Sequence, residues 1–453
     1  MSLQGAVAAH RFGLGARPGE IVAASADPRA WLLSQIETEA DQPQAPPGGK
    51  LLKGGELVAE GQEYVRARAA AKRAGTKEDP VQVFLKSRLP MFRGEMAARF
   101  ALGFTTARPF AERLVWFWSN HFTVSAQNPR ALTFCGAFER EAIRPYIHRK
   151  FEDMLVAVAS HPAMLVYLDN AQSIGPNSLA GQFTGKGLNE NLGRELMELY
   201  SLGVDGGYTQ ADVIALAKIL TGWSVDPKSD SGFNYYPRRH EPGEVTLRGK
   251  TYPPTLQGGI AAVKDLAHDP HTAHHIAVKF ATYFIADTPP PQSVARLEAV
   301  FNKTGGDLKA LAETAVKDPA AWAPKPSKLR SPVEYVTAAY RLLGLPKGKN
   351  SDQQVLAAMG TARNMGEFPL DASSPKGWPL TSDAWSGPDA ILSRIEWAKQ
   401  VGQRMPPGFD AMAVAERGMG PLLQASTRTA MARAETQGDA LAFLLSSPEF
   451  QRR

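Results

Sequence analysis

The chain has 453 residues, 43% of them hydrophobic and 21% charged, so it can bury a sizeable core and does not have the composition of a disordered protein. Its formal net charge of +6 is a mild excess, and the basic stretch 66–77 has no aromatic residues on which bases could stack, which argues against nucleic-acid binding. The single cysteine, Cys135, excludes an internal disulfide and a thiolate metal cluster.

The first part of the chain is predicted to be an N-terminal arm and linker at residues 1–55, followed by a helical body at 56–453. The arm contains the Gly-rich HRFGLGARPGE, and the Pro- and Gly-rich stretch 42–55 is typical of a linker. Strong helix formers and helical periodicity then extend to about residue 169. A polar loop rich in Gly and Ser follows at 170–187.

The middle of the chain predicts a helical hairpin and then a change of character. Residues 188–203 and 209–223 have helical periodicity and are joined by the tight turn VDGG, so we expect them to form a central antiparallel hairpin. Residues 224–259 alternate aromatic, β-branched and turn residues, which predicts one or two short strands. The fold class is therefore mainly α, a large multi-helix single unit with a short β-like excursion at about 224–259.

Helices return after residue 259 and continue, with one interruption, to about residue 443. The interruption is an irregular insertion at 367–389, which carries Trp378 and Trp385 among Pro, Gly and Ser. Because tryptophan buries a large apolar area, we predict that both rings plug the core. The alternative is that they line a cleft beside His240 for a flat substrate such as a sugar or an aromatic compound.

One carboxylate falls on the apolar face of the helix predicted at 188–203. On a projection of about 100° per residue, four leucines share this face: Leu188, Leu192, Leu196 and Leu199. Glu195 lies within about 20° of Leu188, and Glu198 lies at the rim. A buried carboxylate costs several kcal/mol unless it is paired, protonated or bound to a metal. Glu195 is therefore a candidate functional residue.

Histidines in three other places provide further candidates. His121 ends the aromatic helix RLVWFWSNHFTVS, and His240 lies in the loop YYPRRHEPGE. His271 and His275 are four residues apart in HDPHTAHH, which is the spacing of two imidazoles that chelate a transition metal. The sequence contains no phosphate-binding loop, no GxSxG elbow and no GxGxxG after a predicted strand, which argues against the common nucleotide and acyl-transfer enzymes.

Several stretches resemble one family along nearly the whole chain. They are RFGLGARPGE, LVWFWSNHFTVS, NENLGRELMELYSLGVDGGYTQADVIALAKILTGW, RRHEPGEVTLRGKTY, PHTAHHIAVKFATYF, and NMGEFPL followed by SPKGWP and a Trp. In order and spacing they resemble the large bacterial family catalogued as a domain of unknown function, DUF1800. The resemblance implies a largely helical protein without an agreed activity. Many members are exported and often accompany a sulfatase-like family, which the resemblance suggests as a partner.

The resemblance also implies which positions matter. Five residues stand where the family typically has the same residue: His121, Glu195, Glu198, His240 and His275. Tyr200 and Asp269 stand where many relatives have His, so neither is counted as a required ligand.

Two functional hypotheses follow. In the first, the protein is an enzyme with three groups of residues: catalytic Glu195, Glu198 and His121; metal-binding His240, His275 and Glu195; and substrate-binding Arg113, Asn120 and Trp378. Carboxylates and imidazoles without thiolates suit Zn, Mn or Fe(II) and metal-dependent hydrolysis of an unidentified substrate. In the second, the protein is a non-catalytic binding or accessory protein. Its buried His, Glu and Arg side chains then form a structural network that includes an Arg113–Glu195 pair.

The sequence also bears on location. No apolar run approaches the ~18 residues of a membrane span. The N-terminal residues MSLQGAVAAHRFGLGARPGE lack the charged start and apolar centre of a signal peptide. The sequence as written therefore predicts a cytoplasmic protein, or a periplasmic one if a leader has been removed.

Overall fold

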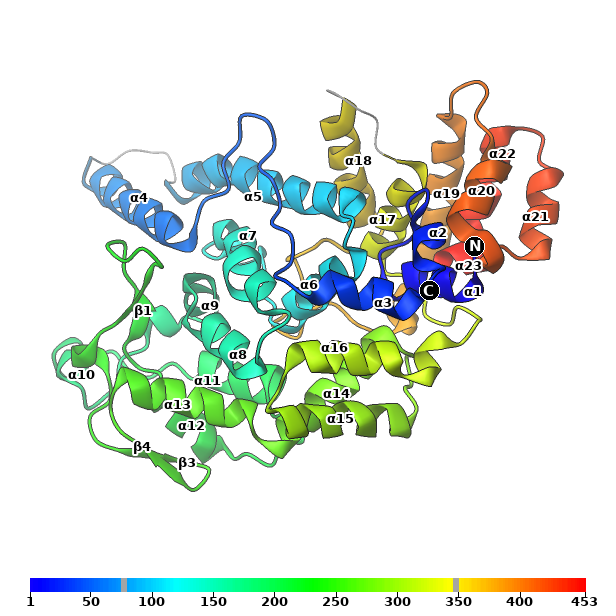
Figure 1. Ribbon diagram of the computed structural model, residues 1–453. Helices are drawn as coiled ribbons and strands as arrows, with labels where there is room; N and C mark the ends of the chain where they lie inside the picture. The colour runs from blue at the N-terminus through cyan, green and yellow to red at the C-terminus, as the bar shows by residue number, and fades with distance from the viewer. Residues whose placement is uncertain (75–79, 345–349) are drawn as a thin grey trace.

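Helices make up most of the computed structural model, which describes residues 1–74, 80–344 and 350–453, without some side chains between residues 63 and 85 and that of residue 350. The first half of the chain contains α1 (Leu3–Val7), α2 (Glu20–Ala24), α3 (Pro28–Leu33), α4 (Gly54–Ala74), α5 (Pro80–Thr105), α6 (Pro109–His121), α7 (Cys135–Phe138), α8 (Phe151–Ser160), α9 (Pro162–Tyr167), α10 (Leu179–Thr184), α11 (Asn191–Glu195) and α12 (Gln210–Ile219). The second half contains α13 (Leu256–Ala267), α14 (Pro270–Phe284), α15 (Pro291–Thr304), α16 (Leu308–Lys317), α17 (Pro332–Leu343), α18 (Asn350–Asn364), α19 (Pro388–Gln403), α20 (Ala411–Met419), α21 (Ala425–Ala432), α22 (Gln437–Ser446) and α23 (Pro448–Gln451). The predicted fold class, mainly α in one unit, is confirmed (Figure 1).

The predicted β-like excursion consists of two separate hairpins. β1 (Trp223–Val225) pairs antiparallel with β2 (Phe233–Tyr235), and β3 (Val245–Leu247) pairs antiparallel with β4 (Lys250–Tyr252). They lie at one end of the molecule, and the C-terminal helices α19 to α22 lie at the opposite end (Figure 1).

Residues 1–36, which the sequence predicts as part of an arm, belong to the helical core instead. The ring of Phe12 is fully buried, and its centroid lies 5.4–6.4 Å from those of three other aromatic rings, Phe110, Phe284 and Trp322. An irregular stretch at 39–53 then leads to α4. The basic stretch 66–77 lies on α4 as far as residue 74, and its remainder falls outside the described residues.

The predicted helical hairpin is present, but its first helix is not regular. α11 continues directly into a π-helical turn, η7 (Leu196–Tyr200), and α12 packs against α11. The two helices approach so closely that a Cβ added at Gly193 would lie 3.1 Å from the backbone nitrogen of Ala217. A larger residue at position 193 would push the helices apart.

The most deeply buried long helix is α6, in which every residue except Asn120 is buried. Its apolar residues explain most of this burial. Phe117, for example, packs edge-on against Phe280 of α14 at a centroid distance of 5.1 Å. The helix also carries two charged side chains into the core, Glu112 and Arg113, which are 2% and 0% exposed.

Each of these two charges is paired. Glu112 accepts two hydrogen bonds from Arg144, at 2.7 and 2.8 Å, and Arg144 also donates to Glu139 at 2.7 Å. Arg113 forms an ion pair with Glu334 of α17. Because buried ions cost free energy unless they are paired and hydrogen-bonded, these contacts fix how α6 packs against η4 (Glu139–Ile143) and α17.

Replacing Arg144 tests the buried pairs. Arg144→Met is expected to lower the free energy of unfolding by roughly 3–5 kcal/mol, because it removes a partner from two buried carboxylates. Urea unfolding measures the change. Arg149→Met is the matched control, because it removes an ion pair with Glu39 whose side chains are 47% and 50% exposed, and it should cost less than about 1 kcal/mol. Equal effects of the two substitutions would contradict the structural role of Arg144.

Candidate functional site

Two of the predicted site histidines come together at the end of η7. The ring centroids of His121 and His275 lie 6.1 Å apart. Each ring donates from Nε2 to a backbone carbonyl: His121 to Tyr200 at 3.2 Å, and His275 to Leu199 at 3.1 Å. The last carbonyls of a helix lack partners within the helix. Both imidazoles therefore cap the helix that carries Glu195.

Both imidazoles are neutral. Burial, with the positive charge of Lys279 nearby, holds the pKa of His121 well below its usual value and lowers that of His275 to about 4. The Nδ1 atom of His121 is enclosed and has no hydrogen-bond partner among the described residues. Burial also lowers the pKa of Lys279, to about 8, with a further contribution from Lys376.

Glu195 and Glu198 do not join the histidines. Glu195 is half-buried, and no hydrogen bond or ion pair links it to another described side chain. Burial, and then the charge of Glu198, raise its pKa above the ordinary value. The predicted Arg113–Glu195 pair is wrong, because Arg113 lies at Glu334 instead.

His240 lies apart from the His121–His275 pair and from Glu195 and Glu198. It is 5% exposed, and its Nδ1 donates to the Thr221 carbonyl at 2.8 Å. The adjacent Glu241 accepts hydrogen bonds from the backbone and side chain of Asn177, at 3.0 and 2.6 Å. Within residues 1–74, 80–344 and 350–453, no three His, Cys, Asp or Glu side chains are grouped so that they could hold a metal ion. The donors predicted for a metal do not form a ligand set.

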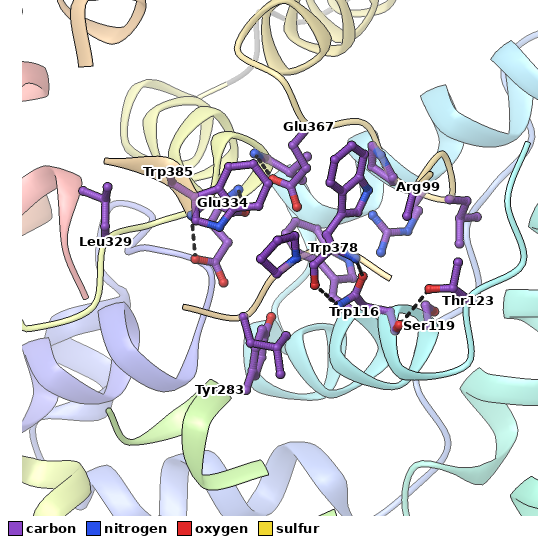
Figure 2. A pocket seen from close by; sticks show the side chains of 18 of the residues that line it. Arg99, Trp116, Ser119, Thr123, Tyr283, Leu329, Glu334, Glu367, Trp378 and Trp385 are labelled. Carbon is purple, nitrogen blue, oxygen red and sulfur yellow. Dashed lines mark hydrogen bonds between the residues drawn. The ribbon is translucent and has the colours of Figure 1, made fainter. Parts of the chain in front are cut away.

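Two of the predicted substrate residues, Asn120 and Trp378, line a pocket between α6, α17 and the irregular insertion, and the third, Arg113, does not line it. We call it the tryptophan pocket after Trp116, Trp378 and Trp385 (Figure 2). Its other lining residues are Arg99, Ser119, Asn120, Thr123, Tyr283, Leu329, Ser331, Val333, Glu334, Glu367, Pro369, Leu370, Ala372, Pro379, Leu380 and Arg453. The volume is about 70 Å³, several times the roughly 10–15 Å³ that one water needs. The pocket suits one small ring or the end of a larger molecule.

Asn120 holds the tryptophan wall in place. Its amide donates to the Trp378 carbonyl at 2.9 Å and accepts from the Trp378 backbone N–H at 2.7 Å. The chain approaches α6 so closely that a Cβ at Gly377, where φ is +80°, would lie 2.3 Å from the Asn120 carbonyl oxygen. Trp378 is half-buried and Trp385 is 7% exposed, with ring centroids 6.0 Å apart. Both rings line the pocket, which His240 does not line, and of the two only Trp385 is buried as predicted.

Two carboxyl groups in the pocket, Glu367 and Glu334, have pKa values that are shifted in opposite directions. Burial raises the pKa of Glu367 to about 7, against hydrogen bonds from Ser331 and from the Val333 backbone N–H at 2.8 Å. Burial would also raise the pKa of Glu334, but the charges of Arg113 and Arg453 outweigh it and lower that pKa to about 2. Both carboxylates accept N–H groups at the start of α17, where Ser331 N donates to Glu334 at 3.2 Å. A carboxyl group that titrates near neutral pH therefore lies beside one that stays ionised.

The family model described as a protein of unknown function (DUF1800) matches residues 7–452. The chain belongs to the DUF1800 family. No curated protein and no solved structure gives a significant match. Among the described residues of this DUF1800 protein, no helix is both long and apolar enough to cross a membrane.

The sequence points to Asn120 and Trp378 but not to the charged groups of the pocket. Glu367 lies in NMGEFPL, a stretch that carries the resemblance to DUF1800, and no local pattern distinguishes it from a surface acid. Glu334 occupies the third position of a capping box that begins at Ser331, which predicts a helix start and nothing more. Their shared pocket depends on contacts between distant parts of the chain.

Glu195→Gln tests whether the half-buried carboxylate is compensated. Its folded-state pKa is raised, so its contribution to stability is present at low pH and is lost as the pH rises through that pKa. The variant should therefore be more stable than the parent at pH 8, by less than about 1 kcal/mol because the side chain is partly exposed. At pH 4 the difference should vanish. Urea unfolding at both pH values measures this, and a less stable variant at pH 8 would indicate a partner for the charge.

Glu367→Gln should also raise the free energy of unfolding at high pH, and by a larger amount than Glu195→Gln. A neutral amide removes the cost of ionising this fully buried group, and a pKa change from 4.5 to about 7 corresponds to about 3 kcal/mol. The gain should be complete at pH 8 and should disappear as the pH falls from 7 to 4.5. Thermal unfolding across this range measures it. A pH-independent difference would show that Glu367 is ionised in the folded state throughout.

Proposed function

We propose that this DUF1800 protein is an enzyme that hydrolyses a bond in a saccharide-like substrate, with Glu367 as general acid–base in the tryptophan pocket. One observation carries the proposal: two neighbouring carboxyl groups in an aromatic pocket have pKa values of about 7 and about 2. Environments that push two carboxyl groups apart in this way are typical of acid–base sites. An aromatic wall together with hydroxyl and amide groups suits a ring with an apolar face and a polar edge.

The chemistry would follow from the state of Glu367. Its carboxyl donates a proton to the departing oxygen as the glycosidic C–O bond breaks. Its carboxylate then accepts a proton from the water that adds to the ring carbon, which restores the acid. Glu334 is held as an anion by Arg113 and Arg453, and its charge favours the protonated form of Glu367. The predicted metal-assisted route gains no support from the positions of His240, His275 and Glu195.

A purely structural role for Glu367 is the alternative that needs excluding. The side chain accepts the Val333 N–H near the start of α17, and a helix start favours a carboxylate. An ionised cap would serve that purpose best. Burial instead favours the neutral form, and a carboxyl neutral near pH 7 is suited to proton transfer.

A screen of chromogenic p-nitrophenyl glycosides, neutral and acidic, tests the proposal. Release of p-nitrophenolate should decline as the pH rises through about 7, because the acid form of Glu367 is lost. Glu367→Gln should lower kcat by about 10²–10⁴-fold and leave the tryptophan fluorescence response to substrate intact. Asp371→Asn is the matched control: Asp371 lies four residues along the same insertion, also has a raised pKa, and does not line the pocket. Full activity of Glu367→Gln, or binding without turnover by the parent, would overturn the enzyme assignment.

A further inference from the structure

Arg99 of α5 brings a guanidinium to the wall of the tryptophan pocket. The residue is 6% exposed, and its Nε donates to Glu139 at 2.7 Å. The guanidinium lies over the ring of Trp116, with its carbon 4.8 Å from the ring centroid. In Figure 2 the guanidinium faces the pocket together with Trp378 and Glu367.

The terminal nitrogens of Arg99 are unused. Among the described residues, neither of them has a hydrogen-bond acceptor, and protein atoms do not fully enclose them. Arg144, which shares Glu139 with Arg99, uses both of its terminal nitrogens on carboxylates and a carbonyl. Because these nitrogens are open to the pocket, they can donate to an acceptor that enters it.

The geometry of Arg99 also limits what that acceptor is. A guanidinium presents parallel N–H groups that match the two oxygens of a carboxylate, and such charge-assisted pairs are stronger than neutral hydrogen bonds. The bond to Glu139 and the contact with Trp116 hold the group in one orientation, which reduces the entropy lost on binding. The three tryptophans meanwhile leave an apolar surface for the rest of the ligand.

We infer that the tryptophan pocket takes a saccharide ring that bears a carboxylate, with Arg99 as the residue that binds the carboxylate. This inference rests on the proposed function and names its substrate class, an acidic sugar. The carboxylate would accept hydrogen bonds from both terminal nitrogens of Arg99, while the apolar face of the ring packs on the tryptophan wall. Arg99 is then a specificity-determining residue that does not take part in proton transfer.

Binding of an anion at Arg99 has a consequence for Glu367. The charge of Arg99 acts to lower the pKa of Glu367, and a carboxylate that neutralises it removes this effect. The bound anion also repels an ionised Glu367. Both effects favour the protonated acid. Glu367 is about half ionised at pH 7, so ligand binding should be accompanied by the uptake of at most about half a proton by Glu367.

Calorimetric titration with glucuronate and with glucose tests the inference. Glucuronate should bind the full-length protein at least about 10-fold more tightly than glucose. Its apparent enthalpy at pH 7 should vary with the ionisation enthalpy of the buffer, which reports proton uptake. In Glu367→Gln the binding should remain and the buffer dependence should disappear. Arg99→Lys should reduce the preference for glucuronate to about 3-fold or less, because the ammonium keeps the charge next to Glu139 but loses the paired N–H groups.

Arg140→Lys is the matched control, since Arg140 is also an arginine paired with a carboxylate, Glu95, and does not line the pocket. It should leave the preference unchanged. If glucose and glucuronate bind equally and Arg99→Lys has no effect, the carboxylate assignment is overturned while the saccharide site stands. If neither sugar binds and tryptophan fluorescence does not respond to any glycoside, both proposals are overturned. Arg99→Gln, checked by circular dichroism, repeats the test without a charge at this position.

Discussion

Helix α6 can occupy the core only because both of its charged side chains are paired. Its apolar residues would bury it in any case, and Glu112 and Arg113 would then be isolated ions in a medium of low polarizability. The chain resolves this by placing Arg144 against one charge and Glu334 against the other. Ion pairs at such depth are sensitive to geometry, so they determine which partners surround α6 in a way that apolar packing alone would not.

The C-terminal end of α6 contacts two different parts of the structure. Asn120 points to the insertion and fixes Trp378, while the next residue, His121, points to the end of η7. His121 and His275 together satisfy carbonyls that a helix end leaves open, which gives the family-typical histidines a structural role in this chain. The two histidines therefore support the end of η7, and the tryptophan pocket lies on the other side of the same end of α6.

The sequence predicts the helices and strands, which depend on local patterns, and misses the contacts between residues that are far apart along the chain. Periodicity and turn residues are enough to predict the helical hairpin and the strands that follow it, although α12 ends at Ile219, and Trp223, predicted as helical, begins β1. The projection that placed Glu195 beside Leu188 assumes a uniform α-helix from residue 188, but α11 begins only at Asn191, and the π turn from Leu196 changes the angle to the later leucine, Leu199. Leu192 and Leu196 are buried as predicted, while Glu195 remains half-buried. The Arg113–Glu334 pair joins residues 221 positions apart, a separation that no local pattern can indicate.

The irregular insertion forms one wall of the tryptophan pocket, and both of its tryptophans line it. An irregular segment with two tryptophans would stabilise the protein most if both rings filled the core. Instead, two hydrogen bonds between Asn120 and the Trp378 backbone and one from the Trp378 indole to the Phe368 carbonyl, at 2.9 Å, hold the segment beside the pocket. Burial raises the pKa of Glu367 beside that space to about 7, and Arg99 brings two donors to it. Ionising Glu367 at this depth costs stability, and under the proposed function a bound substrate that favours the protonated acid would offset that cost.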